Sequence, residues 1–562
     1  MHSSPISSIA AHKKYIATSG YDNQIILWSK ENKDFIARGV HDHLANKVVF
    51  SPDGNYILSA SSDYTVRLWS VPEMRLKIVF DGHNDDVENI CFSNNGQKIA
   101  TASRDRKVRV FNVNGNLMHT LVGHSADALS VVWSKDDQQL ISSGDDGTIR
   151  IWDVESGKEI QNFSFDEVET DTCSILNGYI YAGNDKGEII IIKIHTGEII
   201  KKIKAHESGI KSIVIHEGFK LLLSSSYDKK IILWNIDAIS GNIIEEKIID
   251  SNPMIWLRAT VIVDQKLLAF GTFGTCYATY NLQTSEWNFS KVENTLGKNA
   301  ILAVDGEIFS VGDAGIVYKS DTFYSEPGSL CNFLVNVYDK VYTGGQTGQL
   351  FDASTGKIVY EHRSPLNCGT VFHNDGQTFL VIGSYTGEGI LFKFQDGNLN
   401  FIKNIEIHSN AIKGITSNSK YLFSVSANRD VAYYDLHTLK CIKYIHHGHT
   451  LIANGCDYQD EHRFVSISRD RVLRIWENFE LSKEVNTPHT HSIKCIKAAN
   501  NKRHLIATGS YNGLFCIYNL KTNEWVIIKR LTSSGISSLS YDEATNNFLA
   551  SSYNGKIYYI QI

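Results

Sequence analysis

A short block of residues returns along this chain at a nearly constant interval. Each copy has a small residue, any residue, then Asp or Asn, followed by alternating β-forming residues. The Asp positions 22, 63, 105 and 146 are 41, 42 and 41 residues apart, and positions 470, 512 and 554 are 42 and 42 residues apart. A period kept at both ends of the chain indicates a repeat architecture, in which each unit buries apolar surface against its neighbours.

Each period predicts four short antiparallel strands. In the third copy, the segments 87–93, 98–104, 107–113 and 117–123 alternate apolar and polar residues, and turn-forming residues separate them. Helical periodicity is not sustained at any length. A four-stranded sheet of this size cannot bury both of its faces alone, so the copies must pack against one another. The sequence therefore predicts an all-β protein.

A second regularity concerns histidine. His41, His83, His124 and His206 each precede the Asp of their copy by 22 residues. A His, a Ser, an Asp and a Trp at these spacings can form a hydrogen-bonded chain, in which Asp accepts from His, Ser bridges and the indole N–H is satisfied. Two complete sets are predicted, namely His41, Ser61, Asp63 and Trp69 in the second copy and His206, Ser226, Asp228 and Trp234 in the sixth.

These features resemble the WD-repeat (WD40) β-propeller family, whose Gly-His and Trp-Asp dipeptides bracket each repeat of ~40–45 residues. Gly82-His83 and Gly123-His124 match the first dipeptide, and Trp152-Asp153 matches the second. Fourteen periods cover the chain, of which the fifth and the seventh to tenth are assigned by spacing and turns alone. The resemblance implies that each period is one blade of a propeller.

Fourteen copies fit two rings better than one, because propellers usually close at four to eight blades. We therefore expect two seven-bladed WD-repeat β-propellers in tandem, with fourteen four-stranded blades and domains at 1–293 and 294–562. The printed sequence stops just after the third strand of the last copy, and only residues 1–4 precede the first apparent strand. The last blade is then either three-stranded or completed by another segment.

Composition narrows the class of partner and compartment. A formal net charge of −6 argues against a dedicated nucleic-acid binder. No amino-terminal signal peptide is evident, and no aliphatic run approaches the ~20 residues that span a bilayer. The nine cysteines are odd in number and lack C-x-x-C spacing, which favours free thiols in a reducing compartment. We expect a cytoplasmic protein that binds neither membranes nor nucleic acids.

No catalytic, cofactor or metal motif stands out. The densest metal-like cluster is His446, His447, His449 and Cys456, but His449 holds the histidine position of its repeat. The stretch 354–357, Ser-Thr-Gly-Lys, lacks the preceding Gly-x-x-x-x-Gly of a phosphate loop and is expected to form a hairpin turn. The sequence therefore predicts no enzyme, cofactor or metal centre.

The resemblance also implies a partner-binding face. In that family, the residue before the repeat Asp lies on the turn between the second and third strands, which opens onto one ring face. This position is predicted to bind partners through Tyr21, Arg104, Asp145, Tyr227, Tyr385, Arg429, Arg469, Tyr511 and Tyr553. Tyr and Arg are frequent binding hot spots. Asp86, Glu88 and Asp127 add acidity, so the first ring is expected to prefer a basic segment, while the second is Tyr/Arg-rich.

We interpret the chain as a non-enzymatic scaffold or recognition module that binds protein or peptide partners within a larger complex. Two alternatives stay open. One is a sensor or regulatory subunit of a multiprotein enzyme system, bacterial systems included. The other is a cytoskeletal binder of the actin-interacting tandem-propeller type, which rests on architecture alone. A hydrolase is a more distant alternative, since propellers can host catalysis.

Overall fold

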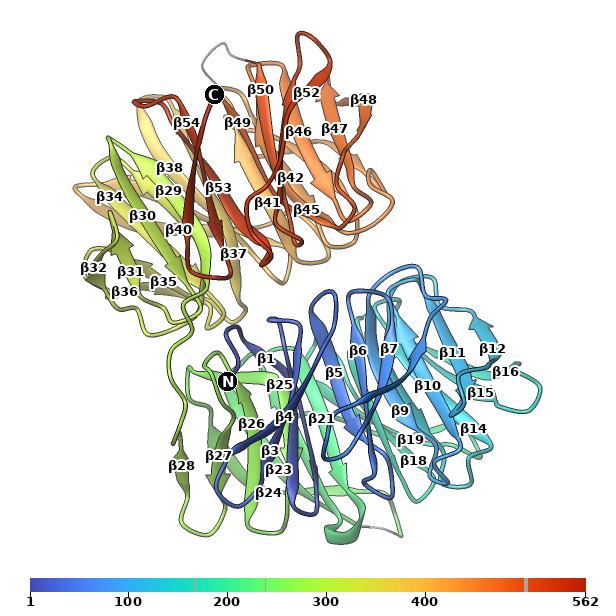
Figure 1. Ribbon diagram of the computed structural model, residues 1–562. Helices are drawn as coiled ribbons and strands as arrows, with labels where there is room; N and C mark the ends of the chain where they lie inside the picture. Colours follow the sequence, from blue (N-terminus) through green and yellow to red (C-terminus); the bar gives the residue numbers. More distant parts are fainter. Residues whose placement is uncertain (166–167, 238, 500–503) are drawn as a thin grey trace. The chain divides into compact units, whose positions relative to one another are not determined.

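The structure is a computed structural model that describes residues 1–165, 168–237, 239–499 and 504–562. These residues form strands β1 to β55 and one short 3-10 turn, η1 (Glu217–Phe219). The strands assemble into fourteen antiparallel sheets, thirteen with four strands and the last with three. We number these sheets blades 1 to 14 in chain order (Figure 1). The predicted all-β fold of fourteen blades is confirmed, and the last blade has three strands in the described part of the chain.

The chain divides into two compact units, Met1–Thr295 and Leu296–Ile562. The sequence analysis had put this boundary between 293 and 294. In the first unit, the first strands of consecutive blades contact one another in the order β1, β5, β9, β13, β17, β21 and β25, and β25 contacts β1. The first unit is therefore a closed ring of seven blades with their first strands innermost.

The strands of the first unit have the following bounds: β1 (Ile6–His12), β2 (Tyr15–Gly20), β3 (Gln24–Ser29), β4 (Phe35–Val40), β5 (Ala45–Phe50), β6 (Tyr56–Ser61), β7 (Val66–Ser70), β8 (Leu76–Phe80), β9 (Val87–Phe92), β10 (Lys98–Ser103), β11 (Lys107–Asn112), β12 (Leu117–Val122), β13 (Ala128–Trp133), β14 (Gln139–Gly144), β15 (Thr148–Asp153), β16 (Glu159–Ser164), β17 (Thr172–Leu176), β18 (Tyr179–Gly183), β19 (Glu188–Lys193), β20 (Glu198–Lys204), β21 (Ile210–His216), β22 (Leu221–Ser226), β23 (Lys230–Ile236), β24 (Ile243–Asp250), β25 (Ile255–Ile262), β26 (Leu267–Thr272), β27 (Ala278–Asn281) and β28 (Glu286–Asn288).

The second unit closes in the same way. Its first strands contact one another in the order β29, β33, β37, β41, β45, β49 and β53, and β53 contacts β29. Its strands are β29 (Lys298–Val304), β30 (Glu307–Gly312), β31 (Val317–Lys319), β32 (Thr322–Ser325), β33 (Cys331–Val337), β34 (Lys340–Gly345), β35 (Gln349–Asp352), β36 (Ile358–Glu361), β37 (Leu366–Asn374), β38 (Gln377–Ser384), β39 (Glu388–Gln395), β40 (Asn398–Glu406), β41 (Ile412–Ser417), β42 (Tyr421–Ser426), β43 (Val431–Asp435), β44 (Cys441–Ile445), β45 (Ala453–Tyr458), β46 (Arg463–Ser468), β47 (Val472–Glu477), β48 (Glu480–Asn486), β49 (Ile493–Ala499), β50 (Leu505–Ser510), β51 (Leu514–Asn519), β52 (Glu524–Arg530), β53 (Ile536–Asp542), β54 (Asn547–Ser552) and β55 (Ile557–Gln561).

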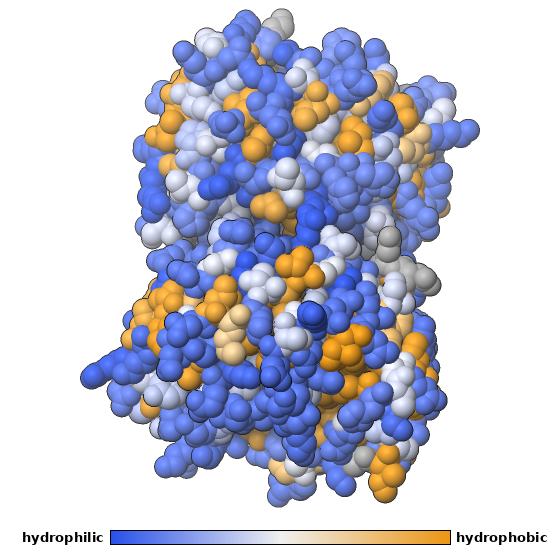
Figure 2. All heavy atoms as spheres, turned by 90° about the vertical axis from the view of Figure 1, so that its right-hand side faces the viewer, coloured by the Kyte–Doolittle hydropathy of each residue, from blue (hydrophilic) through white to orange (hydrophobic). Residues whose placement is uncertain are grey.

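Hydrophobicity follows the position of a strand within its blade. The third strand β19 reads EIIIIK, and all four of its isoleucines are fully buried because both faces of the blade pack against neighbouring blades. The outer strand β20 reads EIIKKIK and is mostly exposed. On the side drawn in Figure 2, apolar residues form spots within a mostly hydrophilic surface. The blades are therefore sandwiched sheets whose outer strands face water.

Short polar side chains near the start of the first strands tie neighbouring blades together. The Asn454 Nδ2 group donates to the backbone oxygen of Ile493 in the next blade at 2.6 Å, and Asn367 makes the same bond to Ile412 at 2.7 Å. The hydroxyl of Ser537 donates to the backbone oxygen of Lys298. This last bond links blade 14 to blade 8, so the second ring closes without a strand shared between its ends.

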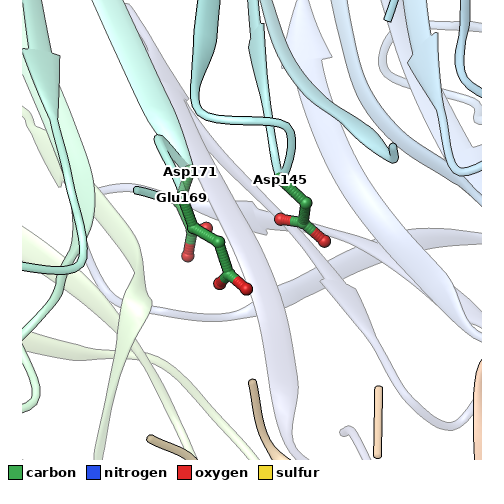
Figure 3. Close-up of side chains that lie close together, drawn as sticks. All are labelled: Asp145, Glu169 and Asp171. Atoms are coloured by element: carbon green, nitrogen blue, oxygen red, sulfur yellow. The ribbon is translucent and has the colours of Figure 1, made fainter. Parts of the chain in front are cut away.

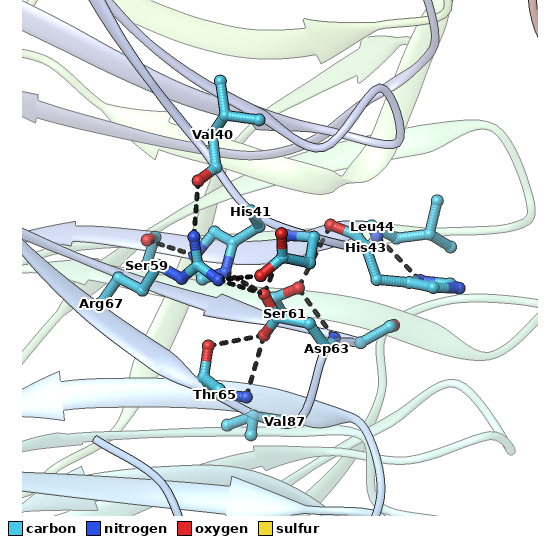
Figure 4. A network of polar contacts seen from close by, with 12 residues as sticks. Val40, His41, His43, Leu44, Ser59, Ser61, Asp63, Thr65, Arg67 and Val87 are labelled. Carbon is cyan, nitrogen blue, oxygen red and sulfur yellow. Dashed lines mark hydrogen bonds and ion pairs between the residues drawn. The ribbon is translucent and has the colours of Figure 1, made fainter. Parts of the chain in front are cut away.

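The predicted His–Asp hydrogen bonds are present, and Figure 4 shows the set in blade 2. His41 Nδ1 lies 2.8 Å from Asp63 Oδ2, and His41 Nε2 lies 2.7 Å from Ser59 Oγ. Trp69 Nε1 donates to the same Ser59 oxygen at 2.8 Å. Because a carboxylate only accepts, Nδ1 carries the proton and Nε2 accepts from the serine. The chain of bonds thus runs from the indole to the carboxylate.

The choice of bridging serine was wrong. Ser61 instead accepts from the Asp63 N–H at 2.9 Å and donates to the His43 oxygen at 3.2 Å. In the strand register, Trp69 lies opposite Ile57 of β6. The hydroxyl of Ser59, and not that of Ser61, therefore reaches both the imidazole and the indole ring.

The same correction holds in blade 6. Ser224 Oγ lies 2.8 Å from His206 Nε2 and accepts from Trp234 Nε1 at 3.0 Å. Ser226 accepts from the Asp228 N–H at 3.2 Å and donates to the Ser208 oxygen at 2.9 Å. In both blades the serine beside the Asp caps the turn, and the serine deeper in the strand bridges the rings.

Blade 1 has a set that the sequence analysis missed. His2 Nδ1 lies 3.0 Å from Asp22 Oδ1, and its Nε2 lies 2.7 Å from Thr18 Oγ1, which also accepts from Trp28 Nε1 at 2.8 Å. His2 precedes Asp22 by 20 residues rather than 22, which hid it from a search at fixed spacing.

We expect a double-mutant cycle to separate the two serines of blade 2. Ser59→Ala and Trp69→Phe should couple by about 1 kcal/mol in the free energy of unfolding, because both remove the same buried hydrogen bond. Ser61→Ala and Trp69→Phe should be additive within about 0.5 kcal/mol. Urea unfolding followed by circular dichroism measures both cycles. An equal coupling for Ser61 would restore the original assignment.

Acid should weaken the second unit through buried histidines, among them His408 and His489. His408 Nε2 lies 2.8 Å from Ser424 Oγ, and His489 Nε2 lies 2.8 Å from Thr508 Oγ1. Burial lowers the pKa of each histidine from 6.5 to about 4. Their folded pKa lies below the unfolded value, so stability is lost as pH falls from about 6.5 towards 4. We expect a loss of about 2 kcal/mol per histidine at pH 5 relative to pH 7. Urea unfolding of His489→Gln should show a smaller pH dependence, and an unchanged one would contradict this account.

Candidate partner-binding faces

One backbone hydrogen bond defines the predicted partner-binding position in every blade. The backbone N–H of the residue at this position donates to the carbonyl of a residue just before the first strand of the same blade. Arg104 donates to Asp86 and Asp145 donates to Asp127 in this way, both at 2.9 Å. We call the donor the face residue. The face residues are Tyr21, Ser62, Arg104, Asp145, Asp185, Tyr227 and Phe273 in the first unit, and Asp313, Gln346, Tyr385, Ala427, Arg469, Tyr511 and Tyr553 in the second.

Arg429 does not hold this position. In blade 11 the bond is made by Ala427, whose N–H donates to the Ala411 oxygen at 2.9 Å. Arg429 has a positive φ of 76° and takes the place in the turn that Tyr64 takes in blade 2, where φ is 70°. The sequence analysis counted back from Asp430, but Asn428 holds the position of the repeat Asp, as Asp63 does in blade 2. The prediction for Arg429 is therefore corrected by two positions.

Charged residues gather on the face of the first unit. Arg104 Nη1 lies 2.7 Å from Asp127 Oδ2, and its Nε contacts Glu88 Oε1. Its side chain is 17% exposed. The neighbouring carboxylates, Glu88 first, outweigh the opposing effect of burial and raise the pKa of Arg104. Arg104 is thus held as a cation between two blades.

Three further carboxylates lie next to Arg104 and its acidic partners. Asp145 follows β14, whereas Glu169 and Asp171 belong to the segment that leads into β17, and Figure 3 shows the three side chains together. Their ligand oxygens lie within 4.8 Å of one another. Among the described residues this is the group of three acidic, His or Cys side chains that could hold a metal ion. Carboxylate oxygens suit hard cations or basic side chains.

Burial and mutual repulsion make these carboxyl groups reluctant to ionise. Burial, followed by the charges of Asp127 and Asp171, raises the pKa of Asp145 well above its usual range. Burial and the charge of Asp145 do the same to the pKa of Glu169. Both shifts are of the kind that marks functional sites.

Asp171 differs because two basic groups contact it. Lys211 Nζ lies 2.8 Å and Arg258 Nη2 lies 3.1 Å from its Oδ2. Burial alone would raise the pKa of Asp171, but Lys211 and then Arg258 lower it. Lys211 Nζ also contacts Asp185 and sits 5.2 Å from the ring centre of Tyr227. Tyr227 therefore belongs to the same cluster.

We call the acidic side chains of this cluster the acidic patch. It comprises Asp86, Glu88, Asp127, Asp145, Glu169, Asp171 and Asp185, set against Arg104, Lys211 and Arg258. The sequence analysis named Asp145 and several neighbours but missed Glu169, Asp171 and Asp185. Blade 5 lacks the Gly-His signal, and Lys186 stands in its turn where blade 4 has the repeat residue Asp146, which obscures the alignment.

Tyr21 lies in an aromatic group on the same unit. Its ring centre is 5.3 Å from that of Trp256 in an edge-to-face arrangement, and Trp256 is 5.1 Å from Phe273. Tyr21 and Phe273 are both face residues, but Phe273 is buried, so Tyr21 and Trp256 are the partly exposed rings of this group.

Three of the seven face residues of the second unit are tyrosines, and two of these lie beside lysines. Lys413 Nζ is 4.5 Å from the ring centre of Tyr385, and Lys494 Nζ is 6.0 Å from that of Tyr511. Tyr511 and Tyr553 are stacked, with ring centres 6.2 Å apart and planes 7° apart. Cation–π contacts of this kind hold the rings in place. The two units thus present faces of different chemistry.

The densest histidine cluster is explained by the repeat. His449 Nδ1 accepts from Arg474 Nη1 at 2.9 Å, so Nε2 carries the proton and donates to Ser466 Oγ at 2.9 Å. Burial lowers the pKa of His449 to about 3. Cys456 lies in β45 with its Sγ 3.9 Å from the Phe423 oxygen. Within the described ranges, no helix combines the length and the apolar character that a membrane crossing requires.

Comparison with known proteins identifies the repeat. The family model "WD domain, G-beta repeat" matches residues 1–29, 39–70, 74–112, 115–153 and 197–235. Pre-mRNA-processing factor 17 of Homo sapiens is 26% identical over 263 residues, which cover 44% of this chain and 36% of that protein.

Two further relatives cover similar parts of the chain. Target of rapamycin complex subunit wat1 of Schizosaccharomyces pombe is 24% identical over 244 residues, 41% of this chain and 76% of its own. WD40 repeat-containing protein HOS15 of Arabidopsis thaliana is 34% identical over 205 residues, 33% of each chain. The match spans little more than a third of the pre-mRNA-processing factors, 36% and 38% of their lengths. The matched repeats, the His–Asp pairs and the fourteen sheets in two rings together show that this chain belongs to the WD40 repeat family.

Proposed function

We propose that this protein is a non-enzymatic recognition module whose acidic patch binds a basic segment of a protein partner. The observation that carries this proposal is the surplus of carboxylates on one face, where seven acidic side chains meet three basic ones. Members of the WD40 family are typically non-enzymatic. Recognition by the ring face therefore requires no chemistry beyond charge and shape.

The electrostatics of the patch favour a cationic ligand. Burial, and then the charges of neighbouring carboxylates, raise the pKa of both Asp145 and Glu169. A Lys or Arg side chain placed between them would favour their ionised forms, as Lys211 and Arg258 already do for Asp171. Charge-assisted hydrogen bonds to carboxylates are among the strongest polar contacts, and Arg forms them in a fixed two-pronged geometry.

The second unit supports a separate partner surface. Its face residues Tyr385, Arg469, Tyr511 and Tyr553, with Lys413 and Lys494 beside them, combine aromatic rings and positive charge. Such residues are frequent hot spots. Two faces of unlike chemistry suit a subunit that joins partners in a larger complex, and one relative is named as a subunit of a target of rapamycin complex.

The two alternatives from the sequence differ in support. A regulatory subunit of a multiprotein enzyme system is compatible with the two faces, whereas an actin-type role has no residue-level support in either unit. All nine cysteines are free thiols, which supports the expected cytoplasmic location.

A peptide titration tests the acidic patch. A fluorescein-labelled oligo-arginine peptide should bind the full chain in anisotropy measurements, and an oligo-glutamate peptide should not. Combined Asp145→Asn and Glu169→Gln replacement should weaken binding about ten-fold or more, as for other close charge pairs. Wild-type affinity should rise with pH, because protons compete with the peptide for carboxyl groups of raised pKa.

The control replaces exposed acids in turns between third and fourth strands. Glu73→Gln with Glu155→Gln removes the same net charge, and both residues are exposed. If this pair weakens binding as much as the patch variant, the peptide senses net charge alone and the proposal is wrong.

The raised pKa of Asp145 should also lower the free energy of unfolding at high pH. Because the folded state raises the pKa of Asp145, the folded state holds its proton more tightly than the unfolded chain, and stability falls as pH rises through the raised value. Asp145→Asn should therefore increase the free energy of unfolding at pH 8 by about 1 kcal/mol. Urea unfolding at pH 6 and 8 measures it, with Glu155→Gln as the control. A loss of stability in Asp145→Asn would show that the carboxylate is structurally required.

A further inference from the structure

One position beside the ring face has two kinds of occupant in the second unit. We call it the rim residue, and it lies two positions after the residue whose carbonyl accepts the bond from the face residue. The four asparagines and the serine at this position each donate to a backbone oxygen of the next blade around the ring. Blades 11 and 13 have a lysine instead. The rim residues of blades 8 to 14 are Asn299, Asn332, Asn367, Lys413, Asn454, Lys494 and Ser537.

Blade 6 of the first unit shows how a lysine at the rim position is balanced. Lys211 Nζ lies 2.8 Å from Asp171 Oδ2 and also contacts Asp185. Asp171 is the rim residue of blade 5, and Asp185 is its face residue. Lys211 Nζ also lies 5.2 Å from the ring centre of Tyr227, the face residue of blade 6. The preceding blade thus supplies two carboxylates to one lysine.

Lys494 of blade 13 holds the same place, but both carboxylates are replaced. Its Nζ lies 6.0 Å from the ring centre of Tyr511, the face residue of its own blade. In the preceding blade the rim residue is Asn454, whose amide is bound to the backbone, and the face residue is Arg469. In the part of the chain that the structure describes, Lys494 makes no ion pair. Two cations therefore occupy the neighbouring places where the first unit has a lysine and an aspartate.

A third cation comes from blade 11. Lys413 Nζ lies 4.5 Å from the ring centre of Tyr385. Three consecutive blades therefore contribute Lys413, Arg469 and Lys494, which are all partly exposed, and we call these three residues the basic arc. Of the seven rim and seven face residues of the second unit, Asp313 of blade 8 alone is acidic. Asp313 is 2% exposed and accepts from a rim asparagine at 2.9 Å, so it is already engaged.

The charge and the donors of the basic arc match a phosphate monoester. Cations held near one another repel, so an anion that neutralises them is favoured. A phosphorylated side chain carries a charge of about −1.5 to −2 at pH 7 and three strong acceptor oxygens. A carboxylate carries a single charge on two oxygens. Lysine and arginine both bind phosphate by charge-assisted hydrogen bonds, and clusters of them recognise phosphorylated peptides.

The aromatic face residues favour a peptide over a nucleotide. Tyr511 and Tyr553 are stacked on one another with planes 7° apart, and Lys413 lies over the ring of Tyr385. These rings are engaged with protein groups, whereas nucleic-acid binding uses aromatic rings as platforms on which bases stack. Tyrosines next to cations are frequent hot spots of protein interfaces.

We propose that the basic arc binds a phosphorylated serine or threonine side chain of a protein partner. This inference rests on the proposed function, because it names the ligand of the second partner surface. The basic arc shares no residue with the acidic patch. A preference for phosphate over carboxylate also agrees with the expectation that oligo-glutamate does not bind.

Three peptide libraries on beads test this proposal. One has a fixed phosphoserine between random residues, and the other two have serine or glutamate at the fixed position. The phosphoserine beads should retain the purified full chain, and the other beads should not. Combined Arg469→Gln and Lys494→Gln replacement should lower the retained fraction about ten-fold or more, as for other close charge pairs. Lys494→Arg should preserve retention, because it keeps the positive charge.

The matched control is combined Lys440→Gln and Lys521→Gln replacement. Both lysines are exposed and lie in turns between the third and fourth strands of blades 11 and 13, so the control removes the same net charge away from the face turns. Circular dichroism checks that every variant folds.

Five outcomes would overturn the proposal. They are no retention on the phosphoserine beads, equal retention on the glutamate beads, equal loss in the control variant, elution by inorganic phosphate at the same concentration as by a phosphoserine peptide, and equally effective elution by a single-stranded oligonucleotide. The last two would make the ligand a phosphate ion alone or a nucleic acid. The Arg469→Gln, Lys494→Gln variant should still bind oligo-arginine through the first unit, so the two proposals fail independently.

Discussion

Every blade of this protein has two apolar faces, and that constraint governs the rest of the structure. A third strand such as β19, with Ile189 to Ile192 fully buried, cannot be stable against water on either side. Each blade must therefore be covered by a blade before it and a blade after it, and a linear stack always leaves two faces bare. Closing the stack into a ring removes both ends. In the first unit, Ile6 and Trp28 of blade 1 share a core cluster with Ala269 and Tyr277 of blade 7.

Ring closure leaves the face residues free to vary. The backbone bond that defines the face position uses only an N–H and a carbonyl, so it forms equally with Arg104, Asp145 or Tyr511. The bond does not fix the type of side chain, which can therefore differ between blades and be chosen for a partner. This separation explains how one repeat produces an acidic patch on one unit and an aromatic, basic face on the other. It also explains why the patch tolerates the raised pKa values of Asp145 and Glu169, since the core is stabilised elsewhere.

Sequence reasoning succeeded where a fixed spacing reflects a fixed geometry. The 22-residue interval between His41 and Asp63 spans one outer connection and one hairpin, and the two side chains do meet at 2.8 Å. It failed where the chain length between the same points changes. His2 lies only 20 residues before Asp22. The error at Arg429 had another origin, because Asp430 was taken for the repeat Asp although Ala427 keeps the interval of 42 residues to Tyr385 and to Arg469. Ser61 was chosen because it is the small residue of the recurring block, two positions before Asp63. The distance to the indole, which the sequence does not reveal, decides which serine bridges.

By itself, the sequence determined the all-β class, the number of blades, the ring size and the His–Asp pairs, because each is a local pattern repeated at constant length. Only the tertiary structure decided which carboxylates form the acidic patch, since Asp145, Glu169 and Asp171 come from two blades whose approach depends on ring curvature. Contacts between distant segments depend on where the closed ring brings them, and that position is not encoded in any single repeat.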